Sequence, residues 1–216
     1  MDFTYDKIAY FYDRTTAHIK CVILIQEFMN KMLDNKFPVN YWHDATKFFA
    51  DCHLGYYLLT FKYLGEKLTK DEEDECAEAW LHHYVNESHH PEFITFSHHI
   101  SDMFEDDMFE MVCDWLAMSY EFGEKDWTEF WMNKMSKKFE WTEEQRLFIS
   151  KMLVTAVENK KEIIELLQKR MFDVRQGNIV FIDQQKEQKE PKRTKQTFVM
   201  KTTQFSMTAK QAMSTF

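Results

Sequence analysis

Histidines and aspartates recur along the first half of the chain in an order that suits metal binding. His43-Asp44 is followed by two histidine pairs, His82-His83 and His89-His90, with His18 upstream and Asp114 downstream. Imidazole and carboxylate groups are the ligands that hard or borderline divalent ions bind in proteins. The order His, His-Asp, His, His, Asp therefore predicts a metal site. A further pair, His98-His99, is a weaker candidate.

Each of these elements also has a simpler interpretation. His18 alone is typical of a hydrogen-bonded core histidine, and His82-His83 of a helix end where a cationic imidazole favours the dipole. His89-His90 fits a solvated loop, and Asp114 could pair with an arginine or a tryptophan N–H. Asp114 nevertheless lies in the apolar stretch MVCDWL, where a carboxylate is costly to bury without a cation. Taken together, the order favours the metal site.

Long helices are expected to position these residues. The chain has only 4 Gly and 3 Pro among 216 residues, and so few breakers are typical of uninterrupted helices. Apolar residues recur at helical spacing. The sequence predicts an all-α bundle of six or seven helices, with helices over 5–34, 39–50, 51–65, 69–86, 102–121, 126–139 and 142–171.

Several residues mark the expected helix ends. Thr69 with Glu72 reads as a capping box, and Thr142 is placed to cap the last helix. Gly123 suits the end of the helix over 102–121. Residues 88–100 are expected to be a loop, because Pro91 unsettles a helix there.

The helix over 39–50 carries both His43 and Asp44. Neighbouring side chains on a helix point about 100° apart, so the two residues would have to straddle a metal between helices. Lys47 lies at i+4 from His43, where it could meet a phosphate as a point charge or serve only as a surface lysine.

Composition changes near the C-terminus. We expect a helical domain over 1–172 and a disordered or extended tail over 173–216, with a possible short strand at 178–183. Residues 185–216 carry seven Lys/Arg and two Glu, a charge of +5. Since the net charge of the chain is −9, the remaining residues carry −14. An acidic body argues against broad nucleic-acid binding by the globular part, whereas the basic tail is a candidate for docking on a partner.

The four cysteines are far apart in the sequence and form no C-x-x-C pair. We expect buried free thiols rather than a zinc-thiolate site or a disulfide framework. No apolar run reaches the roughly 20 residues that span a bilayer, and the first residues lack the order of a signal peptide. The expected location is the cytoplasm, or the host cytoplasm if the chain is viral.

The order of the ligand residues resembles the signature of the HD-domain superfamily of metal-dependent phosphohydrolases. More closely, the chain is similar to an uncharacterised family of small helical HD-like proteins found mostly in phages and bacteria. The resemblance covers roughly residues 15–155 and lies in WHDATKF (42–48), AWLHHYVNESHH (79–90), CDWLAMSYEFGEKDW (113–127) and, more weakly, EEQR (143–146). Thr46 replaces the serine of the family's HDxSKF pattern and keeps a hydroxyl.

The resemblance implies a helical bundle with a metal cleft. Carried over residue by residue, the implied ligands are His18, His43, Asp44 and Asp114. A second metal would be held by His83 and His90, with His82 and His89 as alternatives because the sequence does not fix the rotation of the helix. Asp44 could also orient the nucleophile, and Lys47 is the other candidate catalytic residue. The implied cofactor is one or two divalent ions of Mn, Fe, Zn or Mg.

The expected function is hydrolysis of a nucleotide or another small phosphoester. A divalent ion lowers the pKa of water and polarises a phosphoryl oxygen, which is the chemistry such a substrate needs. Two alternatives stay open: a di-iron HD-type oxygenase, which the His-rich set permits, and a non-enzymatic helical protein, such as a phage factor that binds a host protein. The absence of a Gly-rich phosphate loop and of a G-x-S-x-G elbow excludes several other enzyme classes.

Overall fold

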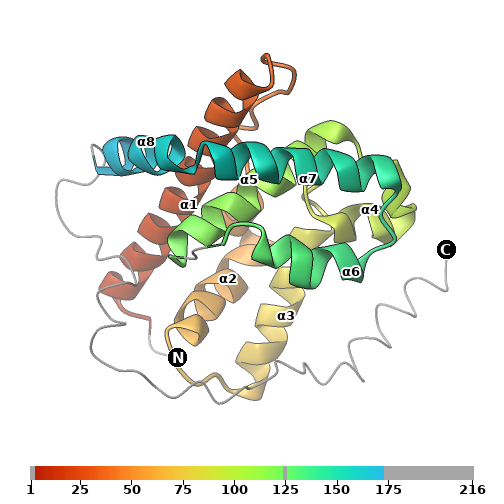
Figure 1. Ribbon diagram of the computed structural model, residues 1–216. Helices are drawn as coiled ribbons and strands as arrows, with labels where there is room; N and C mark the ends of the chain where they lie inside the picture. Colours follow the sequence, from red (N-terminus) through yellow and green to blue (C-terminus); the bar gives the residue numbers. More distant parts are fainter. Residues whose placement is uncertain (1–2, 124–125, 173–216) are drawn as a thin grey trace. The chain divides into compact units, whose positions relative to one another are not determined.

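The computed structural model describes residues 3–123 and 126–172, and this part of the chain is helical throughout, without a strand (Figure 1). The all-α prediction is thereby confirmed for the described residues. The predicted strand at 178–183 and the predicted tail lie outside them. The α-helices are α1 (Tyr5–Met32), α2 (Ala50–Tyr63), α3 (Lys70–Tyr84), α4 (Pro91–Ser97), α5 (Glu105–Glu121), α6 (Ser136–Lys138), α7 (Glu143–Glu158) and α8 (Lys160–Phe172).

Three short turns complete the described helical segments. Two are 3₁₀ turns, η1 (Ala45–Phe48) and η2 (Ile100–Asp102), and the third is a π-helical turn, η3 (Trp131–Met135). The capping box predicted at Thr69–Glu72 is present, and the predicted cap Thr142 also forms a capping box, with Gln145 as its partner. Each box satisfies N–H groups that a helix start would otherwise leave without an acceptor.

Two apolar clusters form the interior, and α1 contributes to both. The larger cluster joins the C-terminal part of α1 to α5, α7 and α8, and includes Val22, Phe109 and Ile149. The smaller cluster joins the N-terminal part of α1 to α2 and α3 through Phe11 and Tyr57. The polar part of α1 that contains His18 falls between the residues of the two clusters.

Helices α2 and α3 pack closely against each other, and Gly55 is where they meet. A Cβ atom at this position would lie 2.3 Å from the Cβ of Ala79 and 2.7 Å from the carbonyl oxygen of Glu75. Only a residue without a side chain allows that approach. Since α3 carries His83, this contact also fixes one wall of the polar site described below.

Three helix predictions were wrong. The helix over 39–50 is instead a turn followed by η1, because Asp44 adopts a left-handed conformation with φ of 58°. The predicted loop over 88–100 contains α4, with Pro91 in its first turn, where proline is tolerated. The single helix over 142–171 is divided at Asn159 into α7 and α8.

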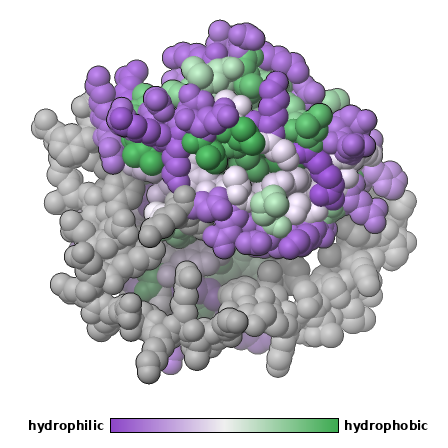
Figure 2. All heavy atoms as spheres, viewed as in Figure 1, coloured by the Kyte–Doolittle hydropathy of each residue, from purple (hydrophilic) through white to green (hydrophobic). Residues whose placement is uncertain are grey.

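The surface mixes hydrophobic and hydrophilic side chains on the face that Figure 2 shows. Exposed apolar residues include Leu147 and Val154 on α7. Within the described ranges, no helix is both long enough and apolar enough to cross a membrane. The four cysteines are buried and none is part of a disulfide, as the sequence predicts.

Substitution Gly55→Ala should destabilise the protein. The added methyl group would overlap Ala79 and the backbone of α3, and overpacking of this kind costs about 1–3 kcal/mol. Chemical denaturation, compared with wild type, measures the change. Tyr63→Ala, at an exposed position of the same helix, is the control, and an equal loss in both variants would contradict the close approach.

Candidate metal centre

Five separate segments bring the predicted ligand residues together. Helix α1 supplies His18, and the turn before η1 supplies His43 and Asp44. Helix α3 supplies His83 near its last turn. The remaining members are His89 and His90, which precede α4, and Asp114 on α5.

The left-handed turn at Asp44 explains how two adjacent residues both reach the interior. His43 is 0% and Asp44 1% exposed, which a regular helix at the protein surface would not allow. Aspartate tolerates this backbone region better than most residues, although the conformation remains less favourable than a helical one. The surrounding packing therefore has to hold the turn in place.

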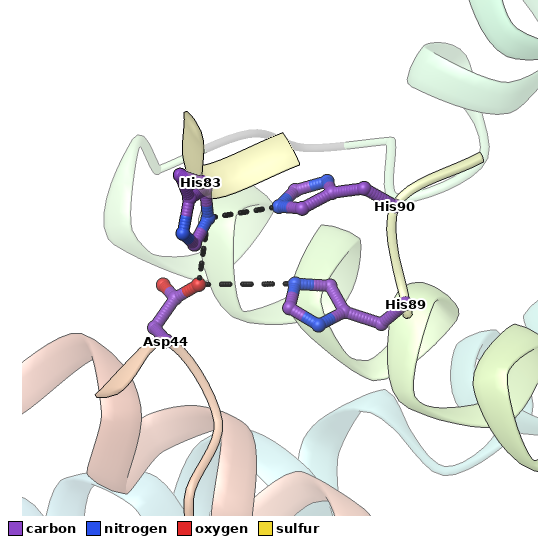
Figure 3. A group of neighbouring side chains, drawn as sticks. All are labelled: Asp44, His83, His89 and His90. Carbon is purple, nitrogen blue, oxygen red and sulfur yellow. Dashed lines mark hydrogen bonds and ion pairs between the residues drawn. The ribbon is translucent and has the colours of Figure 1, made fainter. Parts of the chain in front are cut away.

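Asp44 lies at the centre of the site, and its two carboxylate oxygens face different histidines. Oδ2 is 3.3 Å from His18 Nε2 and 3.5 Å from His43 Nε2. Oδ1 is 3.1 Å from His83 Nε2 and 3.7 Å from His89 Nε2, as Figure 3 shows for the second pair. One carboxylate thus lies between two groups of imidazoles.

These groups define two sets of side chains that could hold a metal ion. His18, His43 and Asp114 form the first set, and each offers a ligand atom within 4.8 Å of the others. The second set meets the same limit and consists of Asp44, His83, His89 and His90. We refer to them as the first and second ligand sets.

The Nδ1 atoms of the histidines are engaged on the side away from Asp44. His18 Nδ1 lies 2.7 Å from Glu121 Oε1, and His43 Nδ1 lies 2.8 Å from Glu110 Oε1. His89 Nδ1 is 3.2 Å from the same Glu110 oxygen. Carboxylates in this position orient a metal-binding imidazole and fix its tautomer, so that Nε2 is left to bind the ion.

His83 is oriented in the same way, through a hydroxyl. The hydroxyl of Thr46 donates to Glu87 Oε1 at 2.6 Å, so its oxygen accepts from His83 Nδ1–H, also at 2.6 Å. The lone pair of His83 Nε2 therefore faces His90 Nε2 at 2.9 Å. Two nitrogens that point at each other in this way need a proton or another cation between them.

Three buried atoms that face this cluster have no hydrogen-bond partner within the described part of the chain. They are His43 Nε2, His89 Nε2 and Asp114 Oδ1. Buried polar atoms are rarely left unsatisfied, and all three belong to the two ligand sets. A cation in each ligand set would satisfy all three atoms, so the residues present fit metal ions.

The protonation states of His83, His90 and Asp44 suit metal binding in the second ligand set, whereas the hydrogen bond to Glu110 outweighs burial and raises the pKa of His89. Burial lowers the pKa of His83 to about 4 and holds the pKa of His90 well below its usual value, which leaves both imidazoles neutral. Burial alone would raise the pKa of Asp44, but electrostatic interactions with His43, Lys47 and His83 outweigh it and hold this pKa well below its usual value. Neutral imidazoles and an ionised carboxylate are the forms that bind metals.

The surroundings of His18 in the first ligand set are strongly acidic. Burial opposes a charged imidazole, yet Glu121, Asp114 and Asp44 outweigh that effect and raise the pKa of His18 well above its usual value. In turn, His18 overcomes the effect of burial on Asp114 and lowers its pKa to about 2. Carboxylates surround His18 at both ring nitrogens, and this arrangement attracts a cation.

Four other predicted or alternative residues do not complete these sets. His82 points toward α2, with Nδ1 3.1 Å from Cys52 Sγ, so the geometry favours His83 over its neighbour. His98 and His99 are exposed and lie outside the two sets. Lys47 is ion-paired with Asp44 and stacks over the Tyr56 ring.

Sequence reasoning identified Asp114 but missed the supporting carboxylates Glu110 and Glu121. With Asp114 they follow one another at helical spacing on α5, whose other buried residues are mostly apolar. That acidic row in an apolar helix was a usable signal, because buried carboxylates need partners. Glu87 offered no comparable signal, because its partner Thr46 lies 41 positions away in the sequence.

The chain belongs to the family of unknown function DUF5662, whose profile matches residues 7–167. Both ligand sets lie inside that range. Searches of curated proteins and of solved structures found no significant match.

Divalent metal should stabilise wild type, and His83→Ala should remove much of that effect. Ligand binding to the folded state adds about 2.7 kcal/mol at a concentration 100 times Kd. We expect Tm to rise by several degrees with Mn²⁺ or Zn²⁺ in differential scanning fluorimetry. His82→Ala, one residue away and outside the sets, should keep the full rise, and equal responses of the two variants would contradict the assignment.

Proposed function

We propose that the protein is an HD-type, metal-dependent phosphohydrolase that acts on a nucleotide or another small phosphoester. The observation that supports this proposal most strongly is the position of Asp44, whose two oxygens face the first and second ligand sets. A carboxylate shared in this way suits a pair of ions, and paired ions are a common solution for hydrolysis of phosphate esters.

The donor atoms favour borderline metals. Imidazole nitrogens outnumber carboxylates in the second ligand set, which suits Mn, Fe or Zn better than Mg. Such ions, when bound, supply a nucleophile at neutral pH by lowering the pKa of water, and they polarise a phosphoryl oxygen.

Lys47 is the residue we propose to contact the substrate phosphate. Its ammonium pairs with Asp44, and its side chain is partly exposed, whereas Asp44 is buried. His90 and Asp114 are partly exposed as well. Approach from solvent through these residues would bring a phosphate to a fixed positive charge beside the two ligand sets.

Substitution Asp44→Asn should abolish hydrolysis. The amide keeps the shape of the side chain but loses the charge that both ligand sets face, so we expect turnover of a responsive phosphoester to fall at least about 100-fold. A panel of nucleotides and phosphoesters, assayed with Mn²⁺, Fe²⁺ or Zn²⁺, provides the measurement. Asp51→Asn, at a largely exposed carboxylate, should leave turnover unchanged.

Two outcomes would favour the other functions. Iron-loaded protein that consumes oxygen and hydrolyses no member of the panel would favour a di-iron oxygenase. Wild type that folds normally and holds no metal after dialysis against a metal solution would favour a non-enzymatic interaction protein. Either result would reject the phosphohydrolase.

Substitution Lys47→Met should weaken substrate use without removing metal. Since the ammonium is proposed to meet phosphate, kcat/KM should fall about 10- to 100-fold while metal content stays at the wild-type level. Steady-state kinetics and elemental analysis together measure the two effects. Unchanged kcat/KM would leave Lys47 as a partner of Asp44 only.

A further inference from the structure

We propose that Glu110 is a shared positioning residue that supports both ligand sets at once. The inference rests on the metal centre of the proposed function. The single carboxylate of Glu110, on α5, supports one imidazole at each ion position.

The geometry around Glu110 is specific. Its Oε1 atom lies 2.8 Å from His43 Nδ1, a member of the first ligand set, and 3.2 Å from His89 Nδ1, a member of the second. Both imidazoles are nearly fully buried, and Glu110 is 7% exposed. The side chain therefore contacts both imidazoles in a region where solvent cannot substitute for it.

Asn40 holds the carboxylate in place from the other side. Its Nδ2 atom donates to Oε1 at 2.9 Å and to Oε2 at 3.0 Å. The backbone N–H of Asn40 donates to Gln26 Oε1 on α1 at 2.8 Å. Glu110 is thus held by Asn40, which is in turn held by Gln26, as a residue that orients ligands must be.

Glu110 accepts hydrogen bonds at both of its oxygens. Asn40 donates to Oε1 and to Oε2, and the two imidazoles approach Oε1 through Nδ1. Because the carboxylate acts as the acceptor in these contacts, both imidazoles carry a proton on Nδ1. Each Nε2 atom is then free to bind an ion, and these two Nε2 atoms are among the unsatisfied ones.

A direct ligand role for Glu110 is the competing interpretation. Glu110, His43 and His89 form a third set whose atoms also lie within 4.8 Å of one another. Their separations of 2.8 and 3.2 Å, however, are those of hydrogen bonds between nitrogen and oxygen. A third ion here would also compete with the Nδ1 protons that the carboxylate stabilises.

Glu121 provides a matched control on the same helix. It contacts His18 Nδ1 at 2.7 Å and Arg14 at 3.7 Å. The histidine that it contacts is His18, so Glu121 supports a member of the first ligand set. The variants E110Q and E121Q remove one buried negative charge each and keep the size of the side chain.

Calorimetric titration of metal-free protein with Mn²⁺, and separately with Zn²⁺, tests the proposal, with elemental analysis of the dialysed protein as the count of ions. Wild type should bind two ions. E110Q should weaken both binding events by about 10- to 100-fold, the usual effect of losing an outer carboxylate. E121Q should weaken one event by a similar factor and leave the other unchanged.

The ¹⁵N shifts of the imidazoles give a readout independent of metal. In metal-free wild type, His43 and His89 should both show the Nδ1–H tautomer, and E110Q should shift that equilibrium in both rings. If E110Q does not fold, Asn40→Ala takes its place, because it leaves Glu110 intact but removes its restraint. We expect smaller losses at both ion positions in that variant.

The outcomes distinguish failure of the proposed function from failure of the proposed role of Glu110. Wild type that binds neither Mn²⁺ nor Zn²⁺ overturns the proposed function, and this inference with it. Wild type that binds two ions, together with an E110Q variant weakened at one position only, overturns the inference alone. Three ions in wild type and two undisturbed ions in E110Q would show that Glu110 is a ligand instead.

Discussion

The burial of negative charge is the constraint on which this structure depends. Asp44, Glu110 and Glu87 are each less than 10% exposed, and Asp114 and Glu121 lie beside them. Lys47 and Arg14 each pair with one of these carboxylates. Uncompensated charges of this kind are too costly to keep in a protein interior, so the cluster requires further cations, either protons on imidazoles or metal ions.

The fold meets this constraint by placing the polar residues where the two apolar clusters adjoin on α1. Helix α5 packs apolar side chains against α1 and α7 while its acidic row faces the histidines. The close contact at Gly55 sets the position of α3, and with it His83. The less favourable backbone at Asp44 is retained because its side chain is held from several directions.

Membership in a family of unknown function leaves the activity to be argued from the site itself. Two arrangements support a metal centre: imidazoles fixed through Nδ1, and unsatisfied Nε2 and carboxylate atoms that converge on one region. The shared carboxylate and the adjacent lysine are the features on which we base the proposal of phosphoester hydrolysis.

The sequence by itself determined the helical class, the helix caps at Thr69 and Thr142, and the kinds of residues that could bind metal, because these follow from local spacing and side-chain chemistry. Tertiary structure decided the rest. Whether His82 or His83 faces inward depends on the rotation of α3 against α2, and the inward turn at Asp44 needs surrounding contacts to hold it. Glu110 gained its role only when α5 approached two distant imidazoles, a relation that local sequence does not encode.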